Sequence, residues 1–549
     1  MTKAQAETFD FIIVGTGAAG LVAALTAHKN GLKPLVIEKA DVWGGSSALS
    51  GGGLWIPNNH LMQADGENDS LEAALTYMDD VIADVGPASS RERKLAYLEN
   101  GPAMAKLMEE LGFRWTRAPR YPDYYPDRPG GRIGRLLEGR TFNGKRLGPW
   151  LKTLRKTAQP SLAMDIDSIP RLPTVIRSAR SFFTTLRVFV RTLAFRLTGR
   201  VPSSQGQSLV AQLMFMVQER RLPVSLSTSL KELVFEGSKV VGVVVEDHQG
   251  LRTINATKGV LLCAGGFARN AEFRLKHQGV TGEWSSASPD DQGDAIQIGA
   301  AAGAATALMD DAWWGPSFMY PDDVPGFCLW ERTLPGSIIV DDKGERYFNE
   351  AESYIDAGHA MLARNKIAGA IPSWLIMDGR FRRRYVFGTM PPGLTPKAMF
   401  TSGFFEMADT LDELARKCGI DAAGLKRTVE RHNAFSKSGV DEDFGRGRTV
   451  YDHYFSDSSV KPNPTLGPID KGPYLACKVY PGDLGTKGGL LTDEHARVLR
   501  DSGEVIDGLY ASGNTTASVM GRTYPGPGST LGPATTFAYI AANHAARQL

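Results

Sequence analysis

The first part of the chain alternates apolar runs with a glycine-rich turn, and this pattern predicts a strand, a helix and a second strand. Residues 11–14 (FIIV) and 34–37 (PLVI) are short apolar runs typical of buried strands. Between them, Gly15, Gly17 and Gly20 form the spacing G-x-G-x-x-G at the start of an alanine- and leucine-rich stretch. Such glycines make a tight turn, let the backbone approach a pyrophosphate and bring helix and strand together. The pattern therefore predicts a dinucleotide-binding unit.

The rest of the chain predicts helices, a β-meander and a return to glycine-rich turns. Residues 68–112 have a helical pattern with breaks near the Gly-Pro pairs at 86–87 and 101–102. Residues 224–260 alternate apolar and polar positions around two glycine turns, which predicts a β-meander. Further expected elements are a buried strand over 260–263, a tightly packed helix of small residues over 291–307, a strand and glycine turn over 508–514, and a final helix over 534–548.

Glycine-rich sequence of this kind occurs at both ends of the chain, and the middle differs. Two tryptophans at 313–314 and the apolar runs 327–330 and 338–340 indicate a separate domain between the ends. We therefore predict an α/β fold, in which a Rossmann-like domain is built from both chain ends and carries an inserted α+β catalytic cap. The predicted divisions are 1–305 and 483–549 for the Rossmann-like domain and 306–482 for the cap.

Residues 165–200 predict an amphipathic helix with basic side chains. At about 100° per residue, seven apolar residues share one face and four arginines lie on the opposite side. The interpretation that we prefer is a helix packed on its own domain, with its arginines in solvent. The alternative is an interfacial helix that contacts a membrane surface through residues 172–200. The apolar residues are Phe182, Phe183, Leu186, Phe189, Val190, Leu193 and Leu197, and the arginines are Arg177, Arg180, Arg187 and Arg191.

Composition narrows the class of protein without changing this picture. A chain of 549 residues is too long for one core, and 42% hydrophobic with 22% charged residues is ordinary for a globular protein. A net charge of +2 gives no reason to expect nucleic acid as a partner. Four widely spaced cysteines and nine scattered histidines show no metal-ligand spacing, so we expect no metal. With no apolar leader or spanning segment, we expect a cytoplasmic protein, possible membrane association through residues 172–200 being the alternative.

The residues after the second predicted strand narrow the dinucleotide to FAD. Glu38 closes that strand, where a carboxylate accepts hydrogen bonds from the adenosine ribose. The small residues 44–47 can wrap a pyrophosphate and approach a flavin ring, and the start of the final helix can stabilise negative charge there. No histidine lies in this cluster, so we expect non-covalent FAD. The expected cofactor-binding residues are Gly15, Gly17, Ala18, Ala19, Gly20, Glu38, Lys39, Gly44, Gly45, Ser46, Ser47, Gly51, Gly52, Ala264, Gly265, Gly513, Asn514, Thr530 and Leu531.

These motifs resemble the fumarate reductase/succinate dehydrogenase flavoprotein superfamily and, within it, the 3-ketosteroid Δ1-dehydrogenases. The resemblance to the superfamily rests on the first glycine unit, the cluster 44–47 and the segment 508–514. It extends from about residue 9 to 545, although about 150 to 200 depart from the pattern and nothing is carried over to them. The resemblance to the Δ1-dehydrogenases rests on 122–125 (PDYY), 344–354 (GERYFNEAESY), 483–490 (DLGTKGGL) and 524–528 (YPGPG).

The resemblance implies an enzyme of steroid degradation that introduces a double bond between C1 and C2 of 3-ketosteroids. Tyr524 and the backbone N–H of Gly528 would hydrogen-bond the C3 carbonyl oxygen and so acidify the C2 hydrogens. Tyr354 would remove a C2 proton as general base with the help of Tyr124, and the C1 hydride would pass to flavin N5. The implied partners are a 3-ketosteroid and an external electron acceptor of unknown identity.

Three other functions stay open on the sequence. A 3-ketosteroid Δ4-(5α)-dehydrogenase shares the flavin machinery, and a fumarate-reductase-like enzyme shares the fold but needs arginine and histidine clamps for carboxylates. The aromatic, proline-rich loop 120–131 suits the pocket of an apolar ketone, although taken alone it is as consistent with a stiff surface connection. A flavin-free, lipid-binding escort protein is the non-enzymatic alternative, and it would leave the glycine motifs unused.

Overall fold

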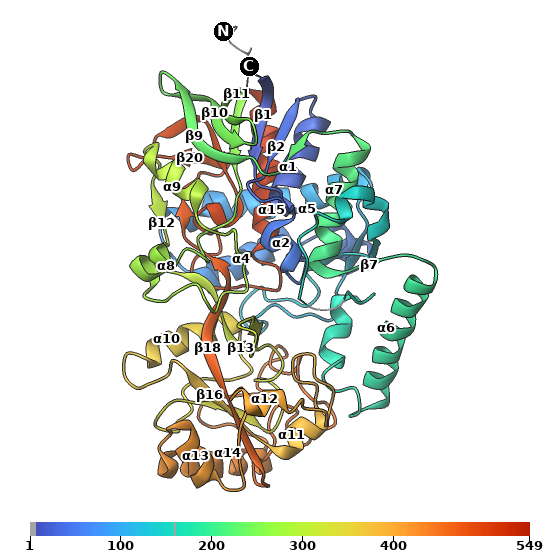
Figure 1. Cartoon of the computed structure of the whole chain (residues 1–549), viewed down its shortest axis with the longest axis vertical. Coiled ribbons are helices and arrows are strands. Elements are labelled where there is room, and N and C mark those ends of the chain that lie inside the picture. Colours follow the sequence, from blue (N-terminus) through green and yellow to red (C-terminus); the bar gives the residue numbers. More distant parts are fainter. Residues whose placement is uncertain (1–6, 159–160, 549) are drawn as a thin grey trace.

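The computed structural model describes residues 7–158 and 161–548, and two sheets organise it, one toward each end of the molecule (Figure 1). The larger sheet has eight strands in the order β20-β21-β11-β1-β2-β8, with β10 and β9 continuing in antiparallel order from β11. The predicted β-meander is confirmed as β9-β10-β11. The strands are β1 (Glu7–Val14), β2 (Pro34–Ile37), β8 (Val224–Ser225), β9 (Ser229–Glu236), β10 (Lys239–Asp247), β11 (Gly250–Leu262), β20 (Arg497–Leu499) and β21 (Val505–Ala511).

The parallel strands of this sheet end at one common edge. Val14 of β1 lies opposite both Ile37 of β2 and Leu262 of β11, and Leu262 lies opposite Ala511 of β21. Each of these residues is the last of its strand. The turns that follow the four strands therefore leave the sheet side by side, at the carboxyl edge where open α/β sheets bind ligands.

Helices from both ends of the chain pack together beside this sheet. α1 (Ala18–Lys29) follows the glycine turn, and its residues 18–27 are all buried. The final helix, α15 (Leu531–Arg547), packs against α1 and against α5 (Arg91–Glu110), and α7 (Gln205–Glu219) also contacts α1. The many alanines of α1 and α15 allow this close approach. The two chain ends thus form one unit, in agreement with the predicted α/β class.

One of the two predicted helix breaks is absent. α4 (Leu71–Ile82) ends before the Gly-Pro pair at 86–87, as predicted. α5 instead runs without interruption through Gly101 and Pro102, so the second predicted break is wrong. A proline ring disfavours helical backbone in the residue before it partly by a clash with that residue's Cβ, and Gly101 has none. Gly101 also faces the Ile56 side chain, which would lie 3.4 Å from a Cβ at this position.

The second sheet has six strands and lies in the lower half of Figure 1. Its order is β14-β13-β18-β16-β15, with β17 paired to β18. The long strand β18 runs from this sheet toward the first one and crosses the proposed division at residue 482; the domain boundaries stay a prediction. The elements of this region are β13 (Ala312–Met319), β14 (Pro325–Phe327), β15 (Ser337–Val340), α10 (Tyr354–Arg364), β16 (Ser373–Asp378), β17 (Glu406–Ala408), α13 (Leu411–Cys418), α14 (Ala422–Ser438) and β18 (Tyr474–Thr486).

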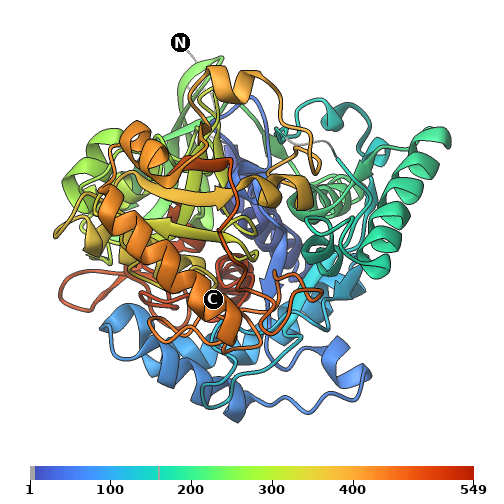
Figure 2. The same ribbon diagram turned by 90° about the horizontal axis from the view of Figure 1, so that it is seen from below.

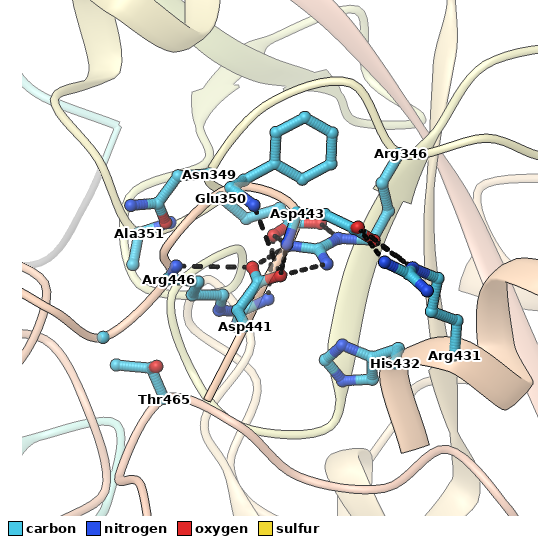
Figure 3. Close-up of polar contacts among 12 residues, drawn as sticks. Arg346, Asn349, Glu350, Ala351, Arg431, His432, Asp441, Asp443, Arg446 and Thr465 are labelled. Atoms are coloured by element: carbon cyan, nitrogen blue, oxygen red, sulfur yellow. Dashed lines mark hydrogen bonds and ion pairs between the residues drawn. The ribbon is translucent and has the colours of Figure 1, made fainter. Parts of the chain in front are cut away.

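A buried cluster of charges holds the segment before α10 in place (Figure 3). Arg346 pairs with Glu350 at 2.7 Å and with Asp441 at 2.8 Å, and Arg446 pairs with Glu350 at 3.2 Å. Burial alone would raise the pKa of Glu350, but the two arginines outweigh it and hold that pKa below its usual value. Removing one member of a buried pair typically destabilises a protein by about 3–5 kcal/mol. The cluster therefore fixes the backbone that leads into α10.

α6 (Ala179–Leu197) lies at the outer edge of the molecule in both views (Figures 1 and 2). It packs on its own domain through a narrow stripe of Ser181, Val188 and Thr192, which are its only buried residues. The seven residues of the predicted apolar face are instead 44–78% exposed. The preferred interpretation, a helix packed on its own domain, is thus confirmed, but only Arg180 and Arg187 are exposed, since Arg177 pairs with Asp457 and Arg191 with Asp165. Side chains that are mostly small and polar make the contact, and the apolar face that suggested packing is in solvent.

Short elements complete the described chain. Within residues 7–158 and 161–548, no helix is long and apolar enough to cross a bilayer.

The predicted small-residue helix over 291–307 is present as the shorter α9 (Asp294–Ala301). The other short elements that border the site are α2 (Gly45–Leu49), β3 (Gly53–Trp55), β4 (Trp115–Arg117), β5 (Leu136–Gly139) and β19 (Gly489–Leu490).

Candidate functional site

The glycine turn after β1 forms one wall of the predicted cofactor site. Gly15 has a left-handed φ of +115°, and a Cβ on it would lie 2.6 Å from the carbonyl oxygen of Cys263 in the neighbouring turn. A Cβ on Gly20 would lie 2.0 Å from the carbonyl oxygen of Gly15. Only glycine fits either place, so the turn is tight and α1 begins directly against it. The backbone N–H groups at the start of α1 belong to Gly17, Ala18 and Ala19.

Glu38 lies directly after β2, beside the glycine turn. Its carboxylate accepts hydrogen bonds from the backbone N–H of Thr16 at 3.1 Å and from the Thr16 hydroxyl at 2.6 Å. Thr16 Oγ1 in turn accepts a bond from the N–H of Gly44 at 3.1 Å. A carboxylate has about four lone-pair sites, so Glu38 keeps acceptor capacity for a ribose. Thr16, which no motif singled out, joins Glu38 to Gly44.

Ser46 and Ser47 lie in α2, which begins at Gly45, and each hydroxyl already accepts one hydrogen bond. Ser47 Oγ accepts from the N–H of Ala18 at 3.1 Å, and Ser46 Oγ accepts from the N–H of Ser288 at 2.9 Å. Each hydroxyl keeps its own proton and can donate it to a phosphate oxygen. The two serines therefore hold the glycine turn and the 288 loop together and remain available as donors.

Three of the expected cofactor residues show no sign of a direct role in binding: two contact other protein segments, and the third is exposed. Lys39 forms an ion pair of 2.5 Å with Asp294 at the start of α9. Gly52 packs against the chain before α7, where a Cβ would lie 2.2 Å from the carbonyl carbon of Gln205. Gly51 is exposed, and no described atom lies within 4 Å of where its Cβ would be. Lys39 and Gly52 thus support the wall of the site, and Gly51 has no contact that ties it there.

The turns after β11 and β21 lie on the other side of the glycine turn. Ala264 and Gly265 follow β11, and the carbonyl of Gly265 accepts a hydrogen bond from the Thr515 hydroxyl at 2.8 Å. This bond joins them to the turn at Gly513 and Asn514 after β21. A small cavity beside this turn is lined by residues that include Gly513, Asn514 and Thr530, and Thr530 immediately precedes Leu531, the first residue of α15. Segments from both chain ends thus meet at one edge.

A buried acid at this edge indicates what kind of ligand fits. Asp291 is 4% exposed, and neither carboxylate oxygen has a hydrogen bond of normal geometry among the described residues, although the N–H of Gly266 approaches. Burial, and next the charge of Asp483, raise its pKa to about 7. One of its oxygens would lie 2.5 Å from a Cβ on Gly265, so it faces the cofactor turn. An acceptor that lacks a donor fits a ligand with hydroxyl groups, such as the ribityl chain of FAD.

Three tyrosines from distant segments meet in one buried cluster. The ring centroids are 5.3 Å apart for Tyr124 and Tyr354, 5.2 Å for Tyr124 and Tyr524, and 5.0 Å for Tyr354 and Tyr524. The Tyr124 hydroxyl donates a hydrogen bond of 3.2 Å to the Tyr354 hydroxyl. The Trp313 ring packs edge-on against Tyr524 at 5.0 Å and donates its indole N–H to Asn514 at 3.1 Å. The tyrosine cluster therefore adjoins the cofactor turn.

The loop that carries Tyr124 is anchored in the interior. The N–H of Tyr124 donates to the carbonyl of Pro525 at 2.9 Å, which joins this loop to the one that carries Tyr524. The neighbouring Asp123 pairs with Arg135 at 2.7 Å, and both are almost fully buried. Burial raises the pKa of Asp123 to about 6, although Arg135 opposes this rise. The alternative interpretation of residues 120–131, a stiff surface connection, is therefore wrong for this part of the loop.

The groups around the Tyr524 hydroxyl leave its proton free to donate. The Thr530 hydroxyl donates to Tyr524 at 3.2 Å. Burial raises the pKa of Tyr524, and the N–H groups of Gly528 and Thr530 lie close enough to its oxygen to offset part of that rise. Gly528 has a left-handed φ of +91°, and a Cβ there would lie 2.4 Å from the carbonyl oxygen of Gly53. The Gly528 N–H thus lies beside the Tyr524 hydroxyl.

Tyr354 is the first residue of α10, and its position depends on side chains that no motif indicated. Burial, and next its neighbour Tyr524, raise the pKa of Tyr354 well above the usual value, while the hydrogen bond from Tyr124 lowers it. The buried guanidinium of Arg332 donates to the carbonyls of Glu350 and Glu352 and holds the backbone before Tyr354. Sequence offered no signal for Arg332, because its role arises from long-range packing alone.

Comparison with known proteins shows which family the chain belongs to. A family model described as FAD binding domain matches residues 10–531. The chain is 43% identical to a 3-oxosteroid 1-dehydrogenase of Mycobacterium tuberculosis, over 99% of each chain. It also matches the crystal structure of 3-ketosteroid delta1-dehydrogenase from Sterolibacterium denitrificans in complex with 1,4-androstadiene-3,17-dione, with a TM-score of 0.93, 40% identity, and coverage of 98% of this chain and 99% of that one.

A more distant structural match bears on one of the alternatives. The crystal structure of 3-ketosteroid-delta4-(5alpha)-dehydrogenase from Rhodococcus jostii covers 100% of this chain and 99% of that one, with a TM-score of 0.66. Its sequence identity is only 21%, so this likeness shows a shared fold and nothing about the reaction. The relatives with 40% and 43% identity are instead named as dehydrogenases that act at position 1 of the steroid. The chain therefore belongs to the FAD-binding domain family and, within it, to the 3-oxosteroid 1-dehydrogenases, with FAD as its cofactor.

Proposed function

We propose that this protein removes hydrogen from C1 and C2 of 3-ketosteroids, with FAD as the immediate acceptor and an external acceptor that reoxidises it. The observation that carries the proposal is the meeting of Tyr124, Tyr354 and Tyr524 beside the cofactor turn at Asn514. An apolar ketone needs a hydrogen-bond donor at its oxygen and a base at the adjacent carbon. The groups that meet here are phenols, which suit that substrate better than the paired cations that a dicarboxylate needs.

Each tyrosine has a distinct role in this proposal. Tyr524 and the backbone N–H of Gly528 donate hydrogen bonds to the C3 oxygen and stabilise the enolate that forms when a C2 proton leaves. Tyr354 takes that proton. The hydrogen bond from Tyr124 to Tyr354 stabilises the phenolate form of Tyr354 and so favours proton removal. The closely packed rings exclude water, which strengthens each of these hydrogen bonds.

FAD, when bound, supplies the acceptor for the hydride that leaves C1. The residues that would hold it are the glycine turn of Gly15 to Gly20, Glu38, and the Gly513–Asn514 turn. The N–H groups at the start of α15, at Leu531, would stabilise negative charge that develops on the bound ring. The protein itself brings the cofactor turn close to Tyr524: the Trp313 ring lies between them, in contact with Tyr524 and hydrogen-bonded to Asn514.

Turnover of androst-4-ene-3,17-dione with an artificial electron acceptor tests the proposal. The expected product has a new double bond between C1 and C2, and anaerobic addition of the steroid should bleach the flavin. Desaturation of a 5α-steroid at C4 would instead identify a Δ4-(5α)-dehydrogenase, and reduction of fumarate would identify a reductase of that type. A colourless protein that binds lipid would support the escort alternative.

Substitution of the proposed base tests its role separately. Tyr354→Phe should retain FAD and steroid binding while flavin reduction falls by about 100-fold or more, the upper range of general-base catalysis. Tyr385→Phe is the matched control, because Tyr385 is equally buried and its hydroxyl bonds Asp457 in the cap. Flavin reduction near the wild-type rate in Tyr354→Phe would refute the assignment of the base.

We also propose that α6 rests on the surface of an anionic bilayer. Its seven exposed apolar residues form one continuous face, and the exposed Arg180 and Arg187 are the two arginines of the opposite side that lie nearest to that face. An apolar face bordered by arginines is typical of interfacial helices, where acyl chains cover the apolar side chains and lipid phosphates attract the cations. A lipophilic substrate partitions into the same surface, so the contact would bring the enzyme to its substrate.

Sedimentation with phosphatidylglycerol-containing vesicles tests the contact. We expect binding that weakens with salt and that Phe183→Ser with Leu193→Ser abolishes, because both side chains are more than half exposed on the apolar face. The matched control is Leu251→Ser with Ile367→Ser, which removes equally exposed apolar side chains elsewhere. Equal loss in both variants, or no binding at low salt, would contradict the proposal.

A further inference from the structure

Lys487 is a fully buried lysine beside the proposed ketone site. Its side chain has no exposed surface, and it follows directly after β18. Its ammonium donates hydrogen bonds of 2.6 Å to the carbonyls of Gly521 and Thr523, the residue immediately before Tyr524. Among the residues that the structure describes, no carboxylate forms an ion pair with it. A buried charge normally requires a partner of opposite charge. Here the two carbonyls and one further contact stabilise the ammonium instead.

The further contact is the face of Trp313. Lys487 Nζ lies 3.9 Å from the centroid of the Trp313 ring, which is a close cation–π arrangement. The same indole packs edge-on against Tyr524 and donates its N–H to Asn514. Lys487 therefore touches the chain before Tyr524 and, through Trp313, one side of the Tyr524 ring and the turn proposed to hold the cofactor.

The burial of this ammonium is unfavourable in itself. Burial lowers the pKa of Lys487 to about 7, although Asp311 and Asp356 act in the opposite direction. An apolar side chain such as methionine would fill a similar volume without the loss of hydration. A cation at this place thus contributes something that packing alone does not, and its contacts indicate where that contribution acts.

From these contacts we propose that Lys487 is a positioning residue, which holds the Tyr524 hydroxyl at the correct place relative to the flavin. Its two hydrogen bonds hold the turn of Gly521 to Thr523, and its cation–π contact holds the Trp313 ring against Tyr524. This inference rests on the proposed role of Tyr524 as the donor to the C3 oxygen. Lys487 itself touches neither substrate nor flavin in this scheme and transfers no proton.

Positioning makes a prediction that ordinary structural support does not. Interactions that act through one another are not additive, so the effect of Lys487→Met should disappear when Tyr524 is already Phe. Lys487→Met should lower kcat/KM at least tenfold, and Tyr524→Phe with Lys487→Met should lie within about threefold of Tyr524→Phe alone. Lys487→Arg keeps donors for both carbonyls and should recover part of the loss.

Binding of 1,4-androstadiene-3,17-dione to the oxidised holoenzyme gives a second readout without turnover. The change in flavin absorption on titration reports the dissociation constant, which should rise in Lys487→Met by a factor similar to that in Tyr524→Phe. Lys94→Met is the matched control, because Lys94 is also buried but pairs with Asp79 at 3.0 Å, outside the tyrosine cluster. It should leave ligand affinity unchanged.

Each outcome decides one question. Wild-type kcat/KM in Lys487→Met, or losses that multiply in the double variant, would overturn the inference. If Tyr524→Phe alone retains full kcat/KM, the proposed role of Tyr524 fails, whatever Lys487 does. Should Lys487→Met not retain FAD, the same cycle is run with Lys487→Arg. Weakened ligand binding that does not multiply with Tyr524→Phe then supports positioning, and unchanged or multiplied binding overturns it.

Discussion

The hydroxyl of Tyr124 donates a hydrogen bond to the hydroxyl of Tyr354, although 230 residues separate them along the chain. Tyr124 comes from a loop of the N-terminal region, and Tyr354 begins α10 in the middle of the chain. Burial raises the pKa of the Tyr354 phenol well above the usual value, which opposes its use as a base. The bond from Tyr124 favours the phenolate and is the main opposing influence within the cluster.

This relationship predicts how activity depends on pH. Because the pKa of Tyr354 is raised, the reactive phenolate is scarce near neutrality and increases about tenfold per pH unit. We expect kcat/KM for a 3-ketosteroid to rise from pH 6 to 9 without a plateau. Tyr124→Phe removes a donor to a charged group, which is worth about 1.5–3 kcal/mol, and should move the profile upward by about one to two pH units. An unmoved profile would separate Tyr124 from the base.

Gly528 should tolerate no side chain. In Gly528→Ala, a left-handed φ is disfavoured by about 1–2 kcal/mol, and the Cβ also meets the carbonyl of Gly53. The loop must then move, and loss of one donor to the enolate typically lowers kcat by about 100-fold or more. Gly503→Ala is the control, because Gly503 has a φ of +85° with no described atom within 4 Å of its Cβ position. Steroid turnover and thermal unfolding of both variants check this.

FAD should be released intact when the protein unfolds. No histidine lies among the residues expected to bind the cofactor, and the groups that these residues offer are hydrogen-bonding groups of turns and helix starts. We expect the yellow colour to pass into the supernatant after acid precipitation, with the mass of the polypeptide unchanged. Flavin that stays with the precipitate would show a covalent bond and contradict the prediction.

His432 should contribute a loss of stability as the pH falls below about 6.5. His432 lies beside the charge cluster of Arg346 and Glu350 (Figure 3). Burial, with Arg346 and Arg446 nearby, lowers its pKa to about 3, and its Nε2 contacts the carbonyl of Gly467 at 3.0 Å. Between pH 6.5 and 3 the unfolded chain binds a proton that the native chain does not, so acid favours unfolding. The free energy of unfolding should lose up to about 1.4 kcal/mol per pH unit.

Denaturant unfolding at pH 7.0, 6.0 and 5.0 measures this slope. This range lies above the unfolded pKa of the carboxylates in the same cluster. Asp123 and Asp291 titrate within it in the native protein, so the difference between the slopes of variant and wild-type protein isolates the histidine. His432→Gln can keep a donor to Gly467. It should reduce the slope of the free energy of unfolding against pH by an amount that corresponds to nearly one proton. The exposed His28→Gln serves as the control and should leave the slope unchanged. Equal slopes in His432→Gln and the wild-type protein would contradict the assignment.

The sequence by itself determined the cofactor half of this protein. Strand, glycine turn, helix and closing carboxylate are contiguous from residue 10 to 38, and local rules of backbone geometry decide what such a segment forms. The same holds for the β-meander and for the glycine turn after β21, where period and turn residues lie within one short window. The family resemblance added the tyrosines, because their motifs are also local.

Only the tertiary structure decided which residues meet. Arg332 carries no local signal. Trp313 and Lys487 lie in segments that the sequence marked, but the roles of all three residues depend on contacts with segments far away in the chain. Pro102 predicted a break, yet the glycine before it and the packing on Ile56 keep α5 whole. The apolar face of α6 has the period of a packed helix, but whether a face is covered depends on the neighbouring surface, which periodicity does not contain.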